Sequence, residues 1–265
     1  MGLALLAERV GRTTLNGVAE IGYAASLFGE SLYWLVMGWR RHQPVRADAV
    51  IAQMMDVGIH AIPIVAVMAG TIGIMLAIQG IYTLRTFGAE TRVVAGVALS
   101  VTREFAPLIT GILVAGRSGS ALAARLGSMR INQELDVLKV MGISPVRFLV
   151  VPVLIAGVVM MPALTFLADL TALGMAGVYV GFDLGMSFHA YVDQTINILR
   201  VSDILHGLVK SGIFAVLITL IGVANGSSVE GGAEGVGRAT TRAVVQAISA
   251  IIVVDMIFVF AMTRQ

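Results

Sequence analysis

Five stretches of this chain are each long and apolar enough to cross a lipid bilayer, and they limit the possible folds more than any other feature. A helix needs about 20 mostly apolar residues to cross about 30 Å of hydrocarbon. The stretches lie at residues 61–84, 93–115, 148–180, 204–224 and 243–262, and the third is long enough to be tilted or broken. Only 13% of the residues are charged, against about 25% in a typical soluble domain. The sequence therefore predicts an all-α polytopic membrane protein, with residues 1–265 forming one domain.

A sixth segment, Ile21–Trp39, is harder to assign. It contains Glu30 and is followed by Arg40 and Arg41, and aromatic residues beside arginines favour the headgroup region. We interpret residues 1–45 as an interfacial region whose helix lies in the membrane plane, with a true crossing as the alternative. Residues 46–265 then form the transmembrane core. Residues 1–20 lack the organisation of a signal peptide, so we expect them to stay in the mature protein.

The distribution of basic residues predicts the orientation. With the N-terminus in the cytoplasm, five crossings place twelve basic residues inside: Arg9, Arg12, Arg40, Arg41, Arg46, Arg117, Arg125, Arg130, Lys139, Arg147, Arg238 and Arg242. Five lie outside: Arg85, Arg92, Arg103, Arg200 and Arg264. Cytoplasmic loops carry an excess of Lys and Arg. We therefore expect a multi-pass inner-membrane protein with a cytoplasmic N-terminus and a periplasmic C-terminus.

A short amphipathic helix is predicted at residues 131–141, between the second and third stretches. Its apolar positions recur along one helical face: Ile131, Leu135, Leu138 and Met141. Gly142 can end the helix in the left-handed conformation, and Pro145 prevents its continuation. Such a helix suits a groove in a soluble partner. A linker helix lying on the membrane surface is the alternative.

Charged residues inside the second stretch need an explanation. Arg103 and Glu104 together cost roughly 5–7 kcal/mol at the centre of a bilayer on insertion scales, so we expect them to face protein, water or a lipid headgroup. Pro107 is a candidate helix break at this point. Ionisable residues within a membrane usually mark functional sites. A purely structural role for the pair is the alternative.

Three further charged residues lie in later stretches. Lys210 either snorkels to the membrane surface or contacts a lipid phosphate. Asp169 and Asp255 are expected to support helix association. Small residues at Gly70, Gly73 and in the range 111–119 have the spacing that permits close helix contact.

No catalytic motif is complete in the sequence. Residues 232–238 lack the Lys-Ser/Thr pair of a nucleotide-binding P-loop, and residues 116–120 lack the final glycine and preceding strand of a nucleophile elbow. The four histidines show no metal-binding spacing, and a net charge of +2 does not favour nucleic acid. We therefore expect no catalytic residue, cofactor or metal in this chain, and the energy for any transport must come from another subunit.

Several motifs, in conserved order from about residue 45 to the C-terminus, resemble the MlaE family of permeases. This family supplies the membrane subunits of MCE-type (Mla) lipid ABC transporters. The matching pieces are Gln79-Gly80, residues 103–107 (REFAP), residues 115–121 (AGRSGSA), Glu134 with Met141-Gly142, and residues 238–242 (RATTR). The resemblance implies a homodimer of five-span subunits, each preceded by a membrane-plane helix.

The resemblance also implies partners and a cargo. A cytoplasmic ABC ATPase, which binds ATP and Mg²⁺, would contact the short helix through Ile131, Glu134, Leu135, Leu138 and Met141. A periplasmic MCE-domain protein would carry phospholipid between the inner membrane and the periplasm or outer membrane, supporting outer-membrane lipid asymmetry. A small cytoplasmic regulatory protein is also implied.

The lipid pocket implied by the resemblance lies at the dimer interface, near the outer leaflet. Its matching positions are Leu76, Leu84, Phe87, Arg103, Glu104 and Phe105, with Lys210 at the headgroup end. The main alternative is a self-contained ion-coupled carrier that uses Arg103, Glu104, Asp169 and Asp255 as an ion path. Such carriers usually show internal repeats and more spans. A non-transporting membrane scaffold is a second alternative.

Overall fold

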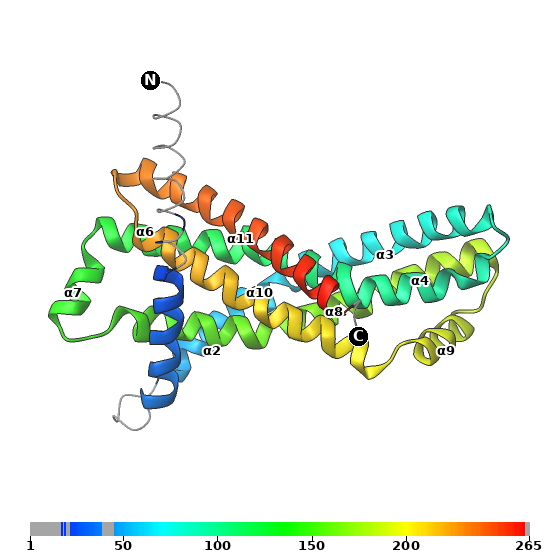
Figure 1. The fold of residues 1–265 in the computed structure, drawn as a ribbon, viewed down its shortest axis with the longest axis horizontal. Coiled ribbons are helices and arrows are strands. Elements are labelled where there is room, and N and C mark those ends of the chain that lie inside the picture. The colour runs from blue at the N-terminus through cyan, green and yellow to red at the C-terminus, as the bar shows by residue number, and fades with distance from the viewer. Residues whose placement is uncertain (1–16, 18, 20–21, 39–44, 263–265) are drawn as a thin grey trace, which may run out of the picture.

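A computed structural model describes residues 22–38 and 45–262, together with Gly17 and Ala19, and these described residues form helices joined by short turns, with no strand. Five helical spans run side by side (Figure 1). They are Ala47–Arg85, Glu90–Ile131, Val146–Leu184, Val201–Ser227 and Gly232–Ala261, each long and apolar enough to cross a membrane. The prediction of an all-α polytopic membrane protein is confirmed. Trp39 and five of the arginines used for orientation lie outside the described residues: Arg9, Arg12, Arg40, Arg41 and Arg264.

The spans are built from shorter helices. The first joins α2 (Ala47–Val57), a 3-10 turn (Ile59–Ala61) and α3 (Ile62–Arg85). The second runs through a 3-10 turn (Glu90–Arg92), α4 (Val93–Ser100), a π turn (Val101–Phe105), α5 (Ala106–Val114), a second π turn (Ala115–Gly119) and α6 (Ser120–Ile131). Then follow α7 (Glu134–Val140), a third π turn (Val146–Val150), α8 (Val151–Leu184), α9 (Phe188–Ile198), α10 (Val201–Ser227) and α11 (Gly232–Met262).

One expectation about proline was wrong. The second span does not break at Pro107, because Pro107 sits in the first turn of α5 directly after a π turn, where its missing N–H removes little hydrogen bonding. The third stretch was expected to be tilted or broken, and α8 is continuous over its 34 residues, Val151–Leu184, with Pro162 inside it. At about 1.5 Å per residue α8 is roughly 50 Å long, which exceeds the hydrocarbon thickness.

The helix α9 was not predicted from the sequence. Ser187 caps it, with its hydroxyl accepting a hydrogen bond of 3.2 Å from the backbone N–H of Ala190. Tyr191 and Thr195, one turn apart, are its buried residues. The serine cap and this spacing were the signals that could have revealed it.

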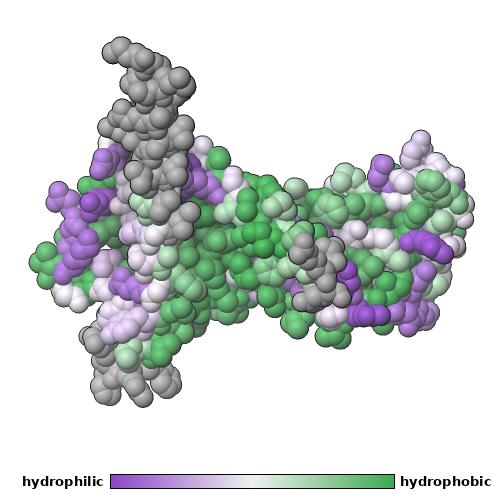
Figure 2. Space-filling model, viewed as in Figure 1, coloured by the Kyte–Doolittle hydropathy of each residue, from purple (hydrophilic) through white to green (hydrophobic). Residues whose placement is uncertain are grey.

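The helix over residues 22–38 lies across the spans at the end of the molecule that carries α7 (Figure 1). We call this the α7 end, and the opposite end, which carries α9, the α9 end. Leu27 of this helix is buried in an apolar cluster with Leu126, Leu135 and Leu149. On the face shown in Figure 2, apolar residues cover the middle of the spans and hydrophilic residues gather toward both ends. This arrangement agrees with the expected membrane-plane helix.

The helix α8 forms the centre of the bundle, with α3 and α10 as its main neighbours. Small residues allow the close approach that the sequence predicted for Gly70 and Gly73. A Cβ atom added at Gly73 would lie 2.1 Å from the carbonyl oxygen of Ala172, and one at Gly70 would lie 3.1 Å from the side chain of Met175. The contact between α3 and α8 therefore requires glycine at position 73.

Replacing Gly73 by alanine is expected to lower the melting temperature of the purified protein. The added methyl group would force α3 and α8 apart, and overpacking of this kind costs about 1–3 kcal/mol. The matched control is Gly174→Ala on α8, where an added Cβ has no neighbour within 4 Å. Thermal unfolding in detergent measures both. Equal melting temperatures for the two variants would contradict the close contact at Gly73.

Candidate functional site: a charged cluster within the spans

The π turn Val101–Phe105 places Arg103 and Glu104 beside the fourth span. A π turn inserts an extra residue into a helix and is common at functional sites. Here it buries Val101 and Thr102 and leaves the side chain of Arg103 about half exposed. The backbone of α10 lies against this turn, because a Cβ at Gly207 would be 2.4 Å from the carbonyl oxygen of Thr102. The two charged residues therefore face the start of α10.

Arg103 forms an ion pair with Asp203 of α10. Its Nη2 and Nε atoms donate to Oδ1 of Asp203 at 2.6 and 2.9 Å. The other carboxylate oxygen accepts the backbone N–H of Arg200 at 2.9 Å, which caps the start of α10. The Asp203 side chain is 4% exposed and that of Arg103 is 52% exposed. The aspartate of the pair is therefore buried and held by a backbone hydrogen bond, whereas the arginine is accessible.

Lys210 joins three spans. Its Nζ atom lies 2.8 Å from Oε2 of Glu104 and 2.8 Å from Oδ1 of Asp255 in α11, and it donates to the carbonyl oxygen of Arg103 at 3.0 Å. Lys210 is 3% exposed, so it does not snorkel to the surface. Asp255 holds this ammonium group as well as supporting helix association. We name Arg103, Glu104, Asp203, Lys210 and Asp255 the charged cluster.

A cavity of about 520 Å³ opens beside the charged cluster. Its polar wall contains Arg103, Glu104, Asp203 and Lys210, together with Arg200 and His206, and its apolar wall contains Leu99, Phe258 and Val259. The three cations Arg103, Arg200 and Lys210 are matched by the carboxylates of Glu104, Asp203 and Asp255. A balanced set of charges next to an apolar wall suits the headgroup of an amphiphile.

A second cavity, of about 300 Å³, lies between α3 and α4. Its lining includes Leu76 and Leu84 of α3 and Val97 of α4, and Ser100 lines both this cavity and the one beside the charged cluster. The predicted lipid positions thus divide between two adjoining cavities. Phe87 and Phe105 line neither, and Phe87 is 79% exposed in the turn after α3.

The roles of two residues of the site were not predicted from the sequence. Asp203 was not singled out, although an acidic residue in the first turn of a predicted span was a usable signal. Asp255 was assigned to helix association, or to an ion path in the alternative carrier, and no sequence rule pairs it with Lys210, 45 positions earlier. The pairing of Asp203 with Arg103 and of Asp255 with Lys210 depends on how α10 and α11 pack against the π turn.

Asp169 of α8 stands apart from both cavities. It is 5% exposed, and neither of its carboxylate oxygens has a hydrogen-bond partner among the described residues. A charged carboxylate without partners inside a membrane span is costly, so a charge on Asp169 would add no stability to the fold.

Replacing Asp169 by asparagine is therefore expected to change stability little. The substitution keeps a polar group of similar size and breaks no hydrogen bond, so the melting temperature should stay within about 2 °C, which corresponds to less than about 1 kcal/mol. The comparison variant is Asp255→Asn, which removes a carboxylate from the buried ammonium of Lys210 and should lower the melting temperature more. A larger loss in Asp169→Asn than in Asp255→Asn would show that Asp169 is ionised and paired.

The predicted partner-binding helix differs from expectation in its bounds and its exposed face. It begins at Glu134 after Gln133, which has a left-handed φ of 59°, so Ile131 belongs to α6 and Met141 follows the helix. The expected stop at Gly142 is confirmed by its φ of 74°.

The apolar face assigned to a partner is turned toward the protein itself. Leu135 is 7% exposed within the cluster around Leu27, and Leu138 packs against that cluster. Val137, Val140 and Met141 are the exposed apolar residues, at 54%, 89% and 66%. Aspartate at position 135 or 138 would therefore disturb the packing of the fold. Aspartate at position 140, which is exposed, would test partner binding without disturbing that packing.

Over most of its length the chain is similar in sequence to known proteins. The profile of the family described as Permease MlaE matches residues 50–261. A probable ABC transporter permease protein of Rickettsia felis is 34% identical over 241 residues, 91% of each chain. The intermembrane phospholipid transport system permease protein MlaE of Haemophilus influenzae is 37% identical over 221 residues, 82% of each chain. A probable ABC transporter permease protein of Synechocystis is 38% identical over 208 residues, 77% of each chain.

Proposed function

This chain belongs to the MlaE permease family, and from that premise we propose that it is the membrane subunit of an ATP-driven phospholipid transporter. In this proposal two copies of the chain work with a separate ATPase and with an MCE-domain protein. The chain itself is a transport component and not an enzyme. Phospholipid is the proposed cargo because the relative from Haemophilus influenzae is named for phospholipid transport.

The observation that carries the proposal is the pairing of two adjoining cavities of different chemistry. The charged cluster lines one of them, and aliphatic side chains such as Leu76 and Leu84 line the other. A phospholipid presents the same division, with a phosphate and often an ammonium on one side and acyl chains on the other. Arg103, half exposed on the cavity side, is the proposed contact for the phosphate.

The exposed side of α7 supports a soluble partner. Val137, Val140 and Met141 present an apolar surface beside charged residues, which is the composition of a helix that lies in a groove. We place the α7 end in the cytoplasm, since Arg130, Lys139 and Arg147 lie there and basic residues favour that side. The α9 end would then face the periplasm and the MCE-domain protein.

Native mass spectrometry of the tagged chain, extracted gently from its own membranes, tests this proposal. The expected species contains two copies of the chain, two copies of an ATPase with a P-loop, and bound phospholipid. Repeated recovery of the chain without any ATPase, under conditions that preserve other ABC complexes, would overturn the proposal. That result would favour a carrier driven by an ion gradient.

A further inference from the structure

A separate cavity of about 420 Å³ lies at the α7 end, beneath the helix over residues 22–38. Residues of this helix, α6, α7, the third π turn and α10 line it. Leu27, Leu126, Leu149 and Val223 form an apolar wall. Ser227, which also lines it, is 17 residues after Lys210 on the same helix, or roughly 25 Å along the axis at 1.5 Å per residue. The cavity is therefore distinct from the one beside the charged cluster.

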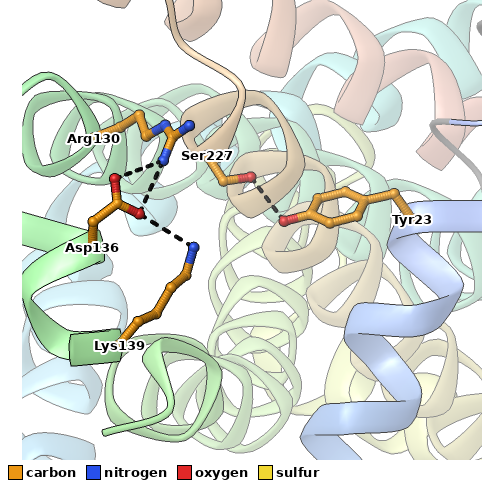
Figure 3. Close-up of polar contacts among 5 residues, drawn as sticks. All are labelled: Tyr23, Arg130, Asp136, Lys139 and Ser227. Carbon is orange, nitrogen blue, oxygen red and sulfur yellow. Dashed lines mark hydrogen bonds and ion pairs between the residues drawn. The ribbon is translucent and has the colours of Figure 1, made fainter. Parts of the chain in front are cut away.

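Two cations of this cavity share one carboxylate. Nη1 of Arg130 lies 3.3 Å from both carboxylate oxygens of Asp136, and Nζ of Lys139 lies 3.3 Å from Oδ1 of the same residue (Figure 3). Arg130 and Lys139 line the cavity, and their side chains are 43% and 61% exposed. One carboxylate between two cations leaves an excess positive charge, and contacts of 3.3 Å are long for charged groups. The pair can therefore bind an added anion.

The opposite charge is supplied by Glu30. Its carboxylate lines the cavity and accepts hydrogen bonds from the hydroxyl of Ser144 at 3.1 Å and from Nε1 of Trp34 at 3.3 Å. The hydroxyls of Tyr23 and Ser227, 3.1 Å apart, also line the cavity (Figure 3). The cavity thus has a cationic side, an anionic side and an apolar wall under a helix that lies across the spans.

We propose that this cavity binds a zwitterionic glycerophospholipid from the leaflet next to α7. Arg130 and Lys139 hold its phosphate, Glu30 faces its ammonium group, and the apolar wall receives the beginning of its acyl chains. A free phosphate ion would use the cations but would leave Glu30 and the apolar wall unused. The proposal concerns binding at the α7 end and does not depend on the transport function proposed above.

Trp34 provides a reporter at this cavity. The chain has two tryptophans, and the substitution Trp39→Phe leaves Trp34, which donates to Glu30, as the single one. The full-length protein in detergent is titrated with phosphatidylethanolamine carrying dibrominated acyl chains, which quench nearby tryptophan fluorescence. We expect saturable quenching. Dibrominated diacylglycerol, which has the same chains and no phosphate, should quench far more weakly, and millimolar inorganic phosphate should not displace the phospholipid.

Three variants in the Trp39→Phe background separate the proposed site from general lipid contact. The double substitution Arg130→Gln with Lys139→Gln should raise the half-saturating phospholipid concentration about tenfold, the loss of at least one charged hydrogen bond. Asp136→Asn should lower that concentration, because it frees both cations. A misfolded protein would not show this gain. Arg238→Gln removes a cation outside the cavity and should change nothing.

Three results would each overturn the proposal. Quenching that never saturates and is equal in all variants would indicate simple partition into the micelle. Equal quenching by diacylglycerol would indicate an apolar groove without phosphate recognition. Displacement of the phospholipid by inorganic phosphate would indicate a site for small anions. None of these results bears on transport, because the readout is Trp34 fluorescence.

Discussion

Replacing Lys210 by methionine is expected to destabilise the protein more than any other single substitution considered for this chain. Lys210 is buried, and its ammonium group lies 2.8 Å from the carboxylates of Glu104 and Asp255. Its removal would leave two carboxylates facing each other inside the membrane. Breaking a buried ion pair by removing one partner costs about 3–5 kcal/mol. The melting temperature in detergent should fall by about 10 °C.

A triple variant distinguishes the role of Lys210 in folding from its role in lipid binding. Combining Lys210→Met with Glu104→Gln and Asp255→Asn removes the charges together, so most of the lost stability should return. Co-purification of phospholipid should still be reduced, since the polar wall of the cavity would have lost the charges of Glu104 and Lys210, with Arg103 left in place. If the triple variant is no more stable than Lys210→Met alone, the carboxylates are not the cause of the loss. If it retains as much bound phospholipid as the unsubstituted protein, Glu104 and Lys210 do not contribute to recognition of the headgroup.

The second large effect is expected on α7, where Val140→Asp should abolish assembly with the ATPase. Val140 is 89% exposed, so the substitution should leave the melting temperature unchanged. In the proposed interface, however, it would bury an unpaired carboxylate against an apolar groove. A loss of about 3 kcal/mol corresponds to binding weakened by roughly a hundredfold. Co-purification of the ATPase and stimulation of its ATP hydrolysis measure the effect.

A matched control for this substitution is Val201→Asp, on a different helix. Val201 is 82% exposed at the start of α10, where an added aspartate also favours the positive end of the helix dipole. Val201→Asp should therefore retain the ATPase. If both variants lose the ATPase equally, the effect is general and α7 is not the contact. If neither variant loses it, the coupling role of α7 is wrong.

The sequence predicted the elements of the fold well because apolar length is a local property. Each of the five stretches needs only its own residues to indicate a crossing, and all five are spans in the structure. The prediction failed where backbone geometry decides the outcome. Pro107 did not end the second span, because it lies in the first turn of α5 directly after the π turn Val101–Phe105. For the third stretch the sequence left a tilt or a break open, and α8 is continuous through Pro162.

The site was predictable only in part for a similar reason. The charge of Arg103, Glu104 and Lys210 within apolar stretches identified them as residues that need partners. Their partners Asp203 and Asp255 depend on how α10 and α11 lie against the π turn, and no periodicity contains that information. Helical spacing likewise identified the apolar face of α7. It did not reveal that Leu135 turns toward Leu27, which is more than a hundred positions earlier.

The central claim is that this chain moves phospholipid with energy from ATP and binds the headgroup at the charged cluster. The most direct measurement is the relocation of a fluorescent phospholipid in proteoliposomes that contain the chain and its co-purified ATPase. We expect relocation that requires ATP, is unaffected by collapse of the ion gradient, and is strongly reduced in Arg103→Gln. Relocation that continues without ATP and follows an imposed proton gradient would contradict the account and would identify an ion-coupled carrier.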